Sequence, residues 1–326
     1  MEPPSTEARY TEPEKLGLLG NPLPVLHDDA RLRAAMVAEF RAAAKDAEDA
    51  VTEIKKKGAA VAVHSSRKAL RRARAVLSLV GSALPKVERR AIKDALQAGR
   101  RGLSRSRDHA VAPETLTLLP LGVEEREAAE KILASAAQAM PPAAEVEELL
   151  RTAAKHAAAQ VEALEAALPQ TLAWDIVEDG VRSVYRAARS ARRAAKRDTA
   201  AFHTWRRRMK ELGYQLEIVG KYAAARVDQI HQEIEGVTAT ASSAVDMLML
   251  REFVETFAEG VDKSRVKHLD VALHAALGDL AKAARKAGRD AFARSPAKFA
   301  KRLARAVKKD LAPPSPPEHD AGDESH

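Results

Sequence analysis

The chain has 326 residues, of which 46% are hydrophobic and only 4% aromatic, and its formal net charge is +8. It contains no cysteine, which excludes disulfides, thiolate metal sites and cysteine nucleophiles. Its first residues lack the basic and apolar regions of a secretion signal, and no apolar run approaches the roughly 20 residues that span a bilayer. These two absences predict a cytoplasmic protein that makes no contact with a membrane. Because alanine supplies much of the apolar content and has the best helix propensity, we expect an all-α fold.

Prolines and caps divide the chain into segments. Residues 1–24 contain five prolines and no periodic apolar pattern, which predicts an extended or mobile arm. Asp28 or Asp29 can cap a first helix that ends near Gly58, and a second helix follows and ends near Gly81 to Pro85. The later segments predict helices at about 87–103, 122–140, 143–167, 175–197, from just after Asp198 to Tyr222, and at 226–235, 238–259, 263–288 and 296–310. Residues 311–326, rich in proline and then acidic, predict a disordered tail.

The second of these helices carries a dense row of basic side chains. At about 100° per residue, one broad face collects six of them, while an ordinary apolar stripe faces the opposite way. The basic face holds His64, Arg67, Lys68, Arg71, Arg72 and Arg74, and the apolar stripe holds Val63, Leu70, Ala73, Val76 and Leu77.

A helix in the second half repeats this pattern. Its polar side holds His203, Arg206, Arg207, Lys210 and Tyr214, and its apolar side holds Phe202, Trp205, Met209, Leu212 and Leu216. Two helices with the same cationic register, one in each half, predict one site built from two related copies. Glu211 and Gly213 stand where the first copy has Arg72 and Arg74.

Charge is also segregated along the chain. Residues 112–180 carry a net charge of −9, and residues 182–210 carry +10. Such segregation favours a focused anion site over a uniformly basic surface. Stacked like charges destabilise a helix by about 0.2–0.5 kcal/mol per pair, and a bound anion would offset this repulsion. Arginine suits phosphate oxygens because its planar guanidinium donates two parallel hydrogen bonds.

The pattern His-x-x-Arg-x-x-x-Arg-Arg-x-Arg, with a shorter His-x-x-Arg-x-x-x-Lys-x-x-x-Tyr version about 140 residues later, resembles the conserved histidine α-helical domain (CHAD) family. Leu103 to Asp108 is similar to the Leu-x-x-x-Arg-Asp segment of that family, and Tyr185-Arg186 is similar to a Tyr-Arg pair at the start of one of its helices. The resemblance implies an all-helical fold of two related halves that binds inorganic polyphosphate.

We therefore predict two related helical bundles of four to five helices each, with pseudo-two-fold symmetry around a basic central groove or cavity. The first half would span residues 25–168 and the second half residues 169–310, with a hinge between Pro169 and Gly180. A C-terminal basic run from Lys298 to Lys309 is helically spaced, and it would either extend the site or form an exposed face.

The predicted function is non-catalytic binding of inorganic polyphosphate, with recruitment to polyphosphate granules. In the absence of polyphosphate, phosphate or sulfate would occupy the site. We expect no enzyme activity, because the sequence has no Gly-rich phosphate loop, paired-carboxylate motif or nucleophile motif. We also expect no metal and no cofactor, since neither motif histidine has a second ligand at suitable spacing. The predicted binding residues are His64, Arg67, Lys68, Arg71, Arg72, Arg74, Arg107, Tyr185, Arg186, Arg189, Arg193, His203, Arg206, Arg207 and Lys210.

Two other functions stay open at the level of sequence. A nucleic-acid-binding or nucleoid-associated protein would bind duplex DNA at least as tightly as polyphosphate and would carry its basic residues on a convex face. The sequence offers little aromatic interleaving for single strands and no recognisable reading-helix motif. A scaffold that docks an acidic protein would show no preference for long phosphate chains over short ones.

Overall fold

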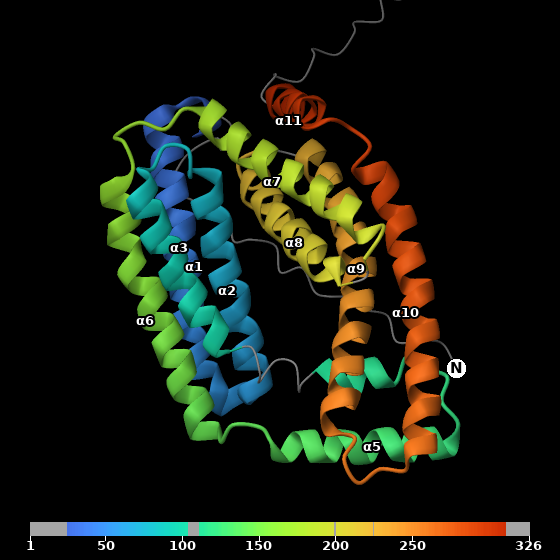
Figure 1. The fold of residues 1–326 in the computed structure, drawn as a ribbon. Coiled ribbons are helices and arrows are strands. Elements are labelled where there is room, and N and C mark those ends of the chain that lie inside the picture. The colour runs from blue at the N-terminus through green and yellow to red at the C-terminus, as the bar shows by residue number, and fades with distance from the viewer. Residues whose placement is uncertain (1–24, 104–110, 199, 224, 311–326) are drawn as a thin grey trace, which may run out of the picture.

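The computed structural model describes residues 25–103, 111–198, 200–223 and 225–310 (Figure 1). These residues are helical with short connections and contain no strand, which confirms the all-α prediction. The predicted arm, the predicted tail and Arg107 lie outside the described residues. The elements are η1 (Val25–His27), α1 (Asp29–Lys57), α2 (Ala59–Leu79), α3 (Lys86–Gly102), α5 (Val123–Gln138), α6 (Ala143–Ala167), α7 (Trp174–Ala195), α8 (Ala201–Gly220), α9 (Ala225–Phe257), α10 (Lys263–Ala291) and α11 (Pro296–Asp310).

The first two helices begin and end where their sequence predicts. The Asp28 carboxylate accepts hydrogen bonds from the backbone N–H groups of Ala30 and Arg31, at 3.1 and 3.0 Å, and so satisfies amides that lack a partner in the first turn of α1. Gly58 separates α1 from α2 with a φ of 83°. Residues other than glycine rarely adopt this backbone conformation, so Gly58 permits the chain to reverse direction here.

The prediction of two helices at 226–235 and 238–259 is wrong. The structure has a single helix there, α9, which continues through Gly236. A glycine inside a helix costs about 1 kcal/mol relative to alanine but leaves its N–H available to the hydrogen-bond ladder. The Thr238 hydroxyl also donates to the Ile234 carbonyl at 2.7 Å across this point.

The helices form two groups around one continuous apolar core (Figure 1). In the first group α1 packs on α2 and α6, and α3 packs on α2 and α6. In the second group α8 packs on α7 and α9, α10 packs on α9, and α11 lies against α7 and α9. Helix α5 precedes residue 168 in sequence, yet it packs against α9 and α10. The half boundaries at 168 and 169 and the pseudo-two-fold axis stay predictions.

The two groups meet where α2 packs against α7 and α8. Gly180 on α7 approaches the end of α2 so closely that a Cβ atom on it would lie 2.6 Å from the Cα of Leu79. Nearby, the Gln215 side-chain amide of α8 donates to the Ser78 hydroxyl of α2 at 2.8 Å. The helices that carry His64 and His203 are therefore packed together, not separated by solvent.

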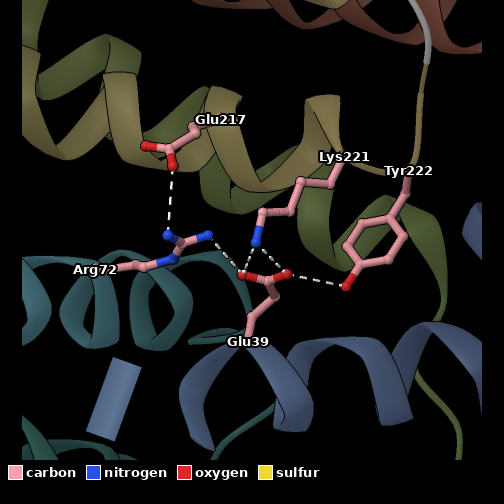
Figure 2. A network of polar contacts seen from close by, with 5 residues as sticks. All are labelled: Glu39, Arg72, Glu217, Lys221 and Tyr222. Atoms are coloured by element: carbon pink, nitrogen blue, oxygen red, sulfur yellow. Dashed lines mark hydrogen bonds and ion pairs between the residues drawn. The ribbon is translucent and has the colours of Figure 1, made fainter. Parts of the chain in front are cut away.

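A buried carboxylate strengthens the same interface (Figure 2). Glu39 on α1 is 5% exposed and accepts hydrogen bonds from Arg72 at 3.0 Å, from Lys221 at 2.9 and 3.0 Å, and from the Tyr222 hydroxyl at 3.1 Å. Arg72 also lies 3.4 Å from Glu217 on α8. Burial lowers the pKa of Arg72, but the Glu39 and Glu217 carboxylates outweigh it and raise that pKa. Burial and the Glu39 charge raise the pKa of Tyr222.

Candidate anion-binding site between the two groups of helices

A basic pocket of about 270 Å³ lies between α2 and α3 on one side and α8 and α9 on the other. Eight of its twelve lining side chains are basic, two are acidic and two are apolar. The lining residues are Arg67, Arg71, Arg74, Arg100, His203, Arg206, Arg207, Lys210, Glu211, Val245, Met249 and Glu252. The structure thus brings together seven of the predicted residues, from both motif helices.

The α2 side of the pocket uses one edge of the predicted basic face. Arg67, Arg71 and Arg74 line it, and they fall within about 60° of one another around the helix axis. Arg72 lies about 100° further round than Arg71, which turns it toward Glu39 and Glu217 instead. Neither His64 nor Lys68 lines the pocket, and both side chains are exposed.

Two of the pocket arginines are held in place by neighbouring elements. Arg67 is only 6% exposed, and its Nη1 donates to the carbonyl of Leu103, next to the end of α3, at 3.0 Å. Arg206 donates from Nε to the Ser242 hydroxyl of α9 at 2.9 Å, and its Nη2 lies 3.9 Å from Asp246. These contacts fix both guanidinium groups at the pocket wall before any ligand arrives, which reduces the entropy lost on binding.

The pocket cations repel one another. Burial lowers the pKa of Arg74; Glu211 opposes this shift, and Arg207, Arg208 and Arg71 add to it. Burial also lowers the pKa of Arg100, and the charges of Arg74, Arg71 and Arg207 lower it further. Both groups stay cationic near neutral pH because the ordinary pKa of a guanidinium lies far above 7. An anion placed among them would therefore gain favourable interactions with several charges at once.

The predicted residues of α7 lie elsewhere. Tyr185 is buried against α11, where its ring stacks on Phe299 with a centroid distance of 3.9 Å, and its hydroxyl donates to the Ala291 and Arg294 carbonyls, each at 3.2 Å. Arg189 donates to the Phe292 carbonyl at 3.1 Å. Arg186 and Arg193 are exposed and do not line the basic pocket. Tyr185 and Arg189 thus attach α7 to the end of α10 and to α11.

Comparison with known proteins shows to which family the chain belongs. The model of the CHAD domain family matches residues 34–255, which is more than half of the chain. The chain belongs to the CHAD domain family. Among solved structures, the crystal structure of the CHAD domain from the plant Ricinus communis is similar, with a TM-score of 0.59 and 15% sequence identity over 82% of this chain and 94% of that one. At this identity the likeness concerns the fold. No curated protein is significantly similar to the chain.

The CHAD match includes every lining residue of the basic pocket and ends before α10 and α11. Arg100 was not among the predicted site residues, although it faces the pocket cations. The sequence of α3 places bases at several angles around the helix, including Arg89, Arg90, Lys93 and Arg101. Periodicity alone could not single out the one that faces α8, and only its position just before the Leu103 segment hinted at it.

The acidic and apolar parts of the lining were also not predicted. Glu211 stood out in sequence as a departure from the first motif, and in the structure it pairs with Arg208 at 2.8 Å beside the pocket. Val245, Met249 and Glu252 come from α9, whose sequence carries no basic stripe. Within the described ranges, no three His, Cys, Asp or Glu side chains gather as metal ligands would. None of the helices in those ranges is long and apolar enough to traverse a bilayer.

Proposed function

We propose that this CHAD protein binds inorganic polyphosphate in the basic pocket and catalyses no reaction on it. The observation that carries the proposal is the convergence of eight basic side chains, from α2, α3 and α8, on one concavity that contains two carboxylates. Guanidinium groups donate parallel hydrogen bonds that match phosphate oxygens. The family resemblance described for the two motifs implies the same ligand.

The electrostatics of the pocket support a chain of several phosphates over a single small anion. Cations lie along the pocket on both sides. Arg67 and Arg74 are seven residue steps apart on α2, or about 10 Å of helix at 1.5 Å per residue, and His203 and Lys210 are equally far apart on α8. A linear polyanion can contact both rows at once. The mutual repulsion of the cations would be relieved in proportion to the phosphates bound.

The lining also favours inorganic phosphate over nucleic acid. No Phe, Tyr or Trp side chain is among the lining residues in the described part of the chain, so bases would find no large aromatic ring to stack on. The same residues include no Ser, Thr or Cys that could act as a nucleophile, which supports binding without chemistry. Recruitment of the protein to polyphosphate granules would follow from such binding.

The test compares two variants of equal charge. Arg71→Ala with Arg207→Ala removes two pocket cations, whereas Arg90→Ala with Arg126→Ala removes two exposed cations outside the pocket. Titration with labelled polyphosphate should show about 100-fold weaker binding for the pocket variant, if each lost charged hydrogen bond is worth about 1.4 kcal/mol, and nearly wild-type binding for the other. Equal losses in both variants would contradict a specific pocket.

Salt and competition give a second test. The dissociation constant should rise steeply with salt, because the binding replaces counterions on a polyanion. Triphosphate should displace labelled polyphosphate at lower concentration than sulfate does. Displacement by duplex DNA at equal or lower phosphate concentration would favour the nucleic-acid alternative instead. Granule recruitment can be followed by fluorescence microscopy of the tagged protein and the same two variants.

A further inference from the structure

A second basic concavity, of about 560 Å³, lies at the far end of α9 from the first. It is formed by the start of α9, the connection between α10 and α11, and one face of α11. Its lining residues are Arg226, Gln229, Ile230, Arg294, Lys298, Lys301, Arg302, Arg305 and Ala306. Six of these nine side chains are basic and none is acidic. We call it the α11 pocket.

The cations of the α11 pocket are spaced for a common ligand. Lys298, Lys301, Arg302 and Arg305 follow one another at intervals of three, one and three residues, which places them on one face of α11. Among the described residues, Lys298, Lys301 and Arg305 have no ion pair. Neighbouring like charges destabilise a helix, so this face is more basic than the packing of α11 requires.

Specific contacts hold the α11 pocket in shape. Arg302 pairs with Glu233 of α9 through two hydrogen bonds of 2.6 and 2.5 Å, which join α11 to α9. The Tyr185 hydroxyl bonds the Arg294 carbonyl, and the Tyr185 ring stacks on Phe299 of α11. The Arg302–Glu233 pair and the Tyr185 contacts position both walls of the pocket, while the side chains of Lys298, Lys301 and Arg305 remain available.

We propose that the α11 pocket is a second, separate binding site for inorganic phosphate chains. Arginine and lysine on both walls supply donors for phosphate oxygens, and Ile230 and Ala306 give the pocket an apolar floor. No aromatic side chain lines it in the described part of the chain, which argues against stacked bases and hence against nucleic acid. Helix α11 follows the last residue matched by the CHAD family model, whereas Arg226, Gln229 and Ile230 lie inside the match.

The site rests on its own residues and does not depend on the basic pocket between α2 and α8. The two pockets share α9: Ile230 lines one and Val245 lines the other, and 15 residues of helix separate them by about 22 Å. A short phosphate chain such as tripolyphosphate should therefore occupy each pocket independently. Two sites on one protein would also favour long chains, which can engage both once bound to either.

The experiment is isothermal titration with tripolyphosphate at low salt, on the full chain. Wild type should bind two equivalents. The α11 variant carries Lys298→Ala, Lys301→Ala and Arg305→Ala, and it should bind one equivalent. The α2–α8 variant removes the same charge from the other pocket through Arg71→Ala, Arg207→Ala and Lys210→Ala, and it should also bind one. Circular dichroism melts should show that both triple variants keep the fold. The single substitution Lys301→Ala leaves the other cations in place and should weaken binding at one of the two sites about 10-fold.

The outcomes separate the two proposals. A second equivalent that persists unchanged in the α11 variants would overturn the α11 site and leave the proposed function untouched. If the α11 variant loses an equivalent and the α2–α8 variant still binds like wild type, the proposed function is refuted and the α11 site is supported. Displacement of tripolyphosphate from the α11 pocket by duplex DNA at equal phosphate concentration would overturn the choice of ligand.

Discussion

Oε2 of Glu39 lies 3.0 Å from Nη2 of Arg72, and this contact assigns a motif arginine to the scaffold (Figure 2). Arg72 belongs to the same basic run as Arg71, which lines the pocket. The neighbouring arginines therefore have different tasks: Arg71 faces the proposed ligand, and Arg72 joins α2 to α1 and α8 through Glu39 and Glu217.

Glu39→Gln should destabilise the protein by about 3 kcal/mol, because it leaves the largely buried Arg72 and the exposed Lys221 without their shared counterion. Glu217 remains 3.4 Å from Arg72 and limits the loss. The measurement is the free energy of unfolding in urea. Glu48→Gln, which removes the same charge from an exposed position on α1, should change that free energy by less than about 0.5 kcal/mol. Equal effects of the two substitutions would contradict a structural role for Glu39.

Arg207→Ala should weaken polyphosphate binding about 10-fold while leaving the unliganded protein as stable as wild type, or slightly more stable. The reason is that the exposed Arg207 lowers the pKa values of Arg74 and Arg100, which means that it repels them when no anion is bound. Arg72→Ala should do the opposite and cost about 2–3 kcal/mol of stability, since it leaves the Glu39 carboxylate partly uncompensated. Thermal melts and polyphosphate titrations of both variants check this. A clear loss of stability in Arg207→Ala would argue against repulsion in the pocket.

Gly180→Ala should destabilise the protein by about 1–3 kcal/mol through overpacking, because its Cβ would meet the backbone of Leu79. Gly278→Ala is the matched control, since nothing lies within 4 Å of a Cβ there and alanine stabilises a helix interior by about 0.5–1 kcal/mol relative to glycine. Chemical denaturation should therefore give shifts of opposite sign. Stabilisation by Gly180→Ala would show that α2 and α7 do not approach closely.

Glu233→Gln should reduce stability at neutral pH by less than about 1 kcal/mol, because the pair that it removes is partly exposed. The hydrogen bond from Arg302 lowers the pKa of Glu233 below 4.5. The ionised carboxylate therefore contributes fully above the unfolded pKa, and its contribution is lost as the pH falls through the lower folded pKa. The stability difference from wild type should shrink as the pH falls below the unfolded pKa, and it should disappear once the pH is below the lower folded pKa.

The control for this pH series is Glu235→Gln on the same helix. The exposed Glu235 has no ion pair in the described part of the chain, so its removal should change the pH profile little. A difference between wild type and Glu233→Gln that stays constant from pH 7 to pH 3 would contradict the ion pair between α9 and α11.

Helix positions could be predicted well wherever caps and breakers were strong. The Asp28 cap, Gly58 and the Pro141-Pro142 step mark real helix ends, because their effects on the backbone are local. Gly236 was misinterpreted as a break, since a single glycine weakens a helix without removing a hydrogen bond. The basic lining residues on α2 and α8 were likewise predictable because their spacing confines them to one side of a helix.

By itself, the sequence determined that the chain is helical, that two of its helices carry a basic face, and that the two motifs resemble those of the CHAD family. Only the tertiary structure decided which side of each basic face meets a neighbour. Arg71 and Arg72 are adjacent in sequence and about 100° apart around α2, and packing turned one toward α8 and the other toward Glu39. Periodicity specifies directions around one helix axis, whereas a binding site depends on how several axes are placed together.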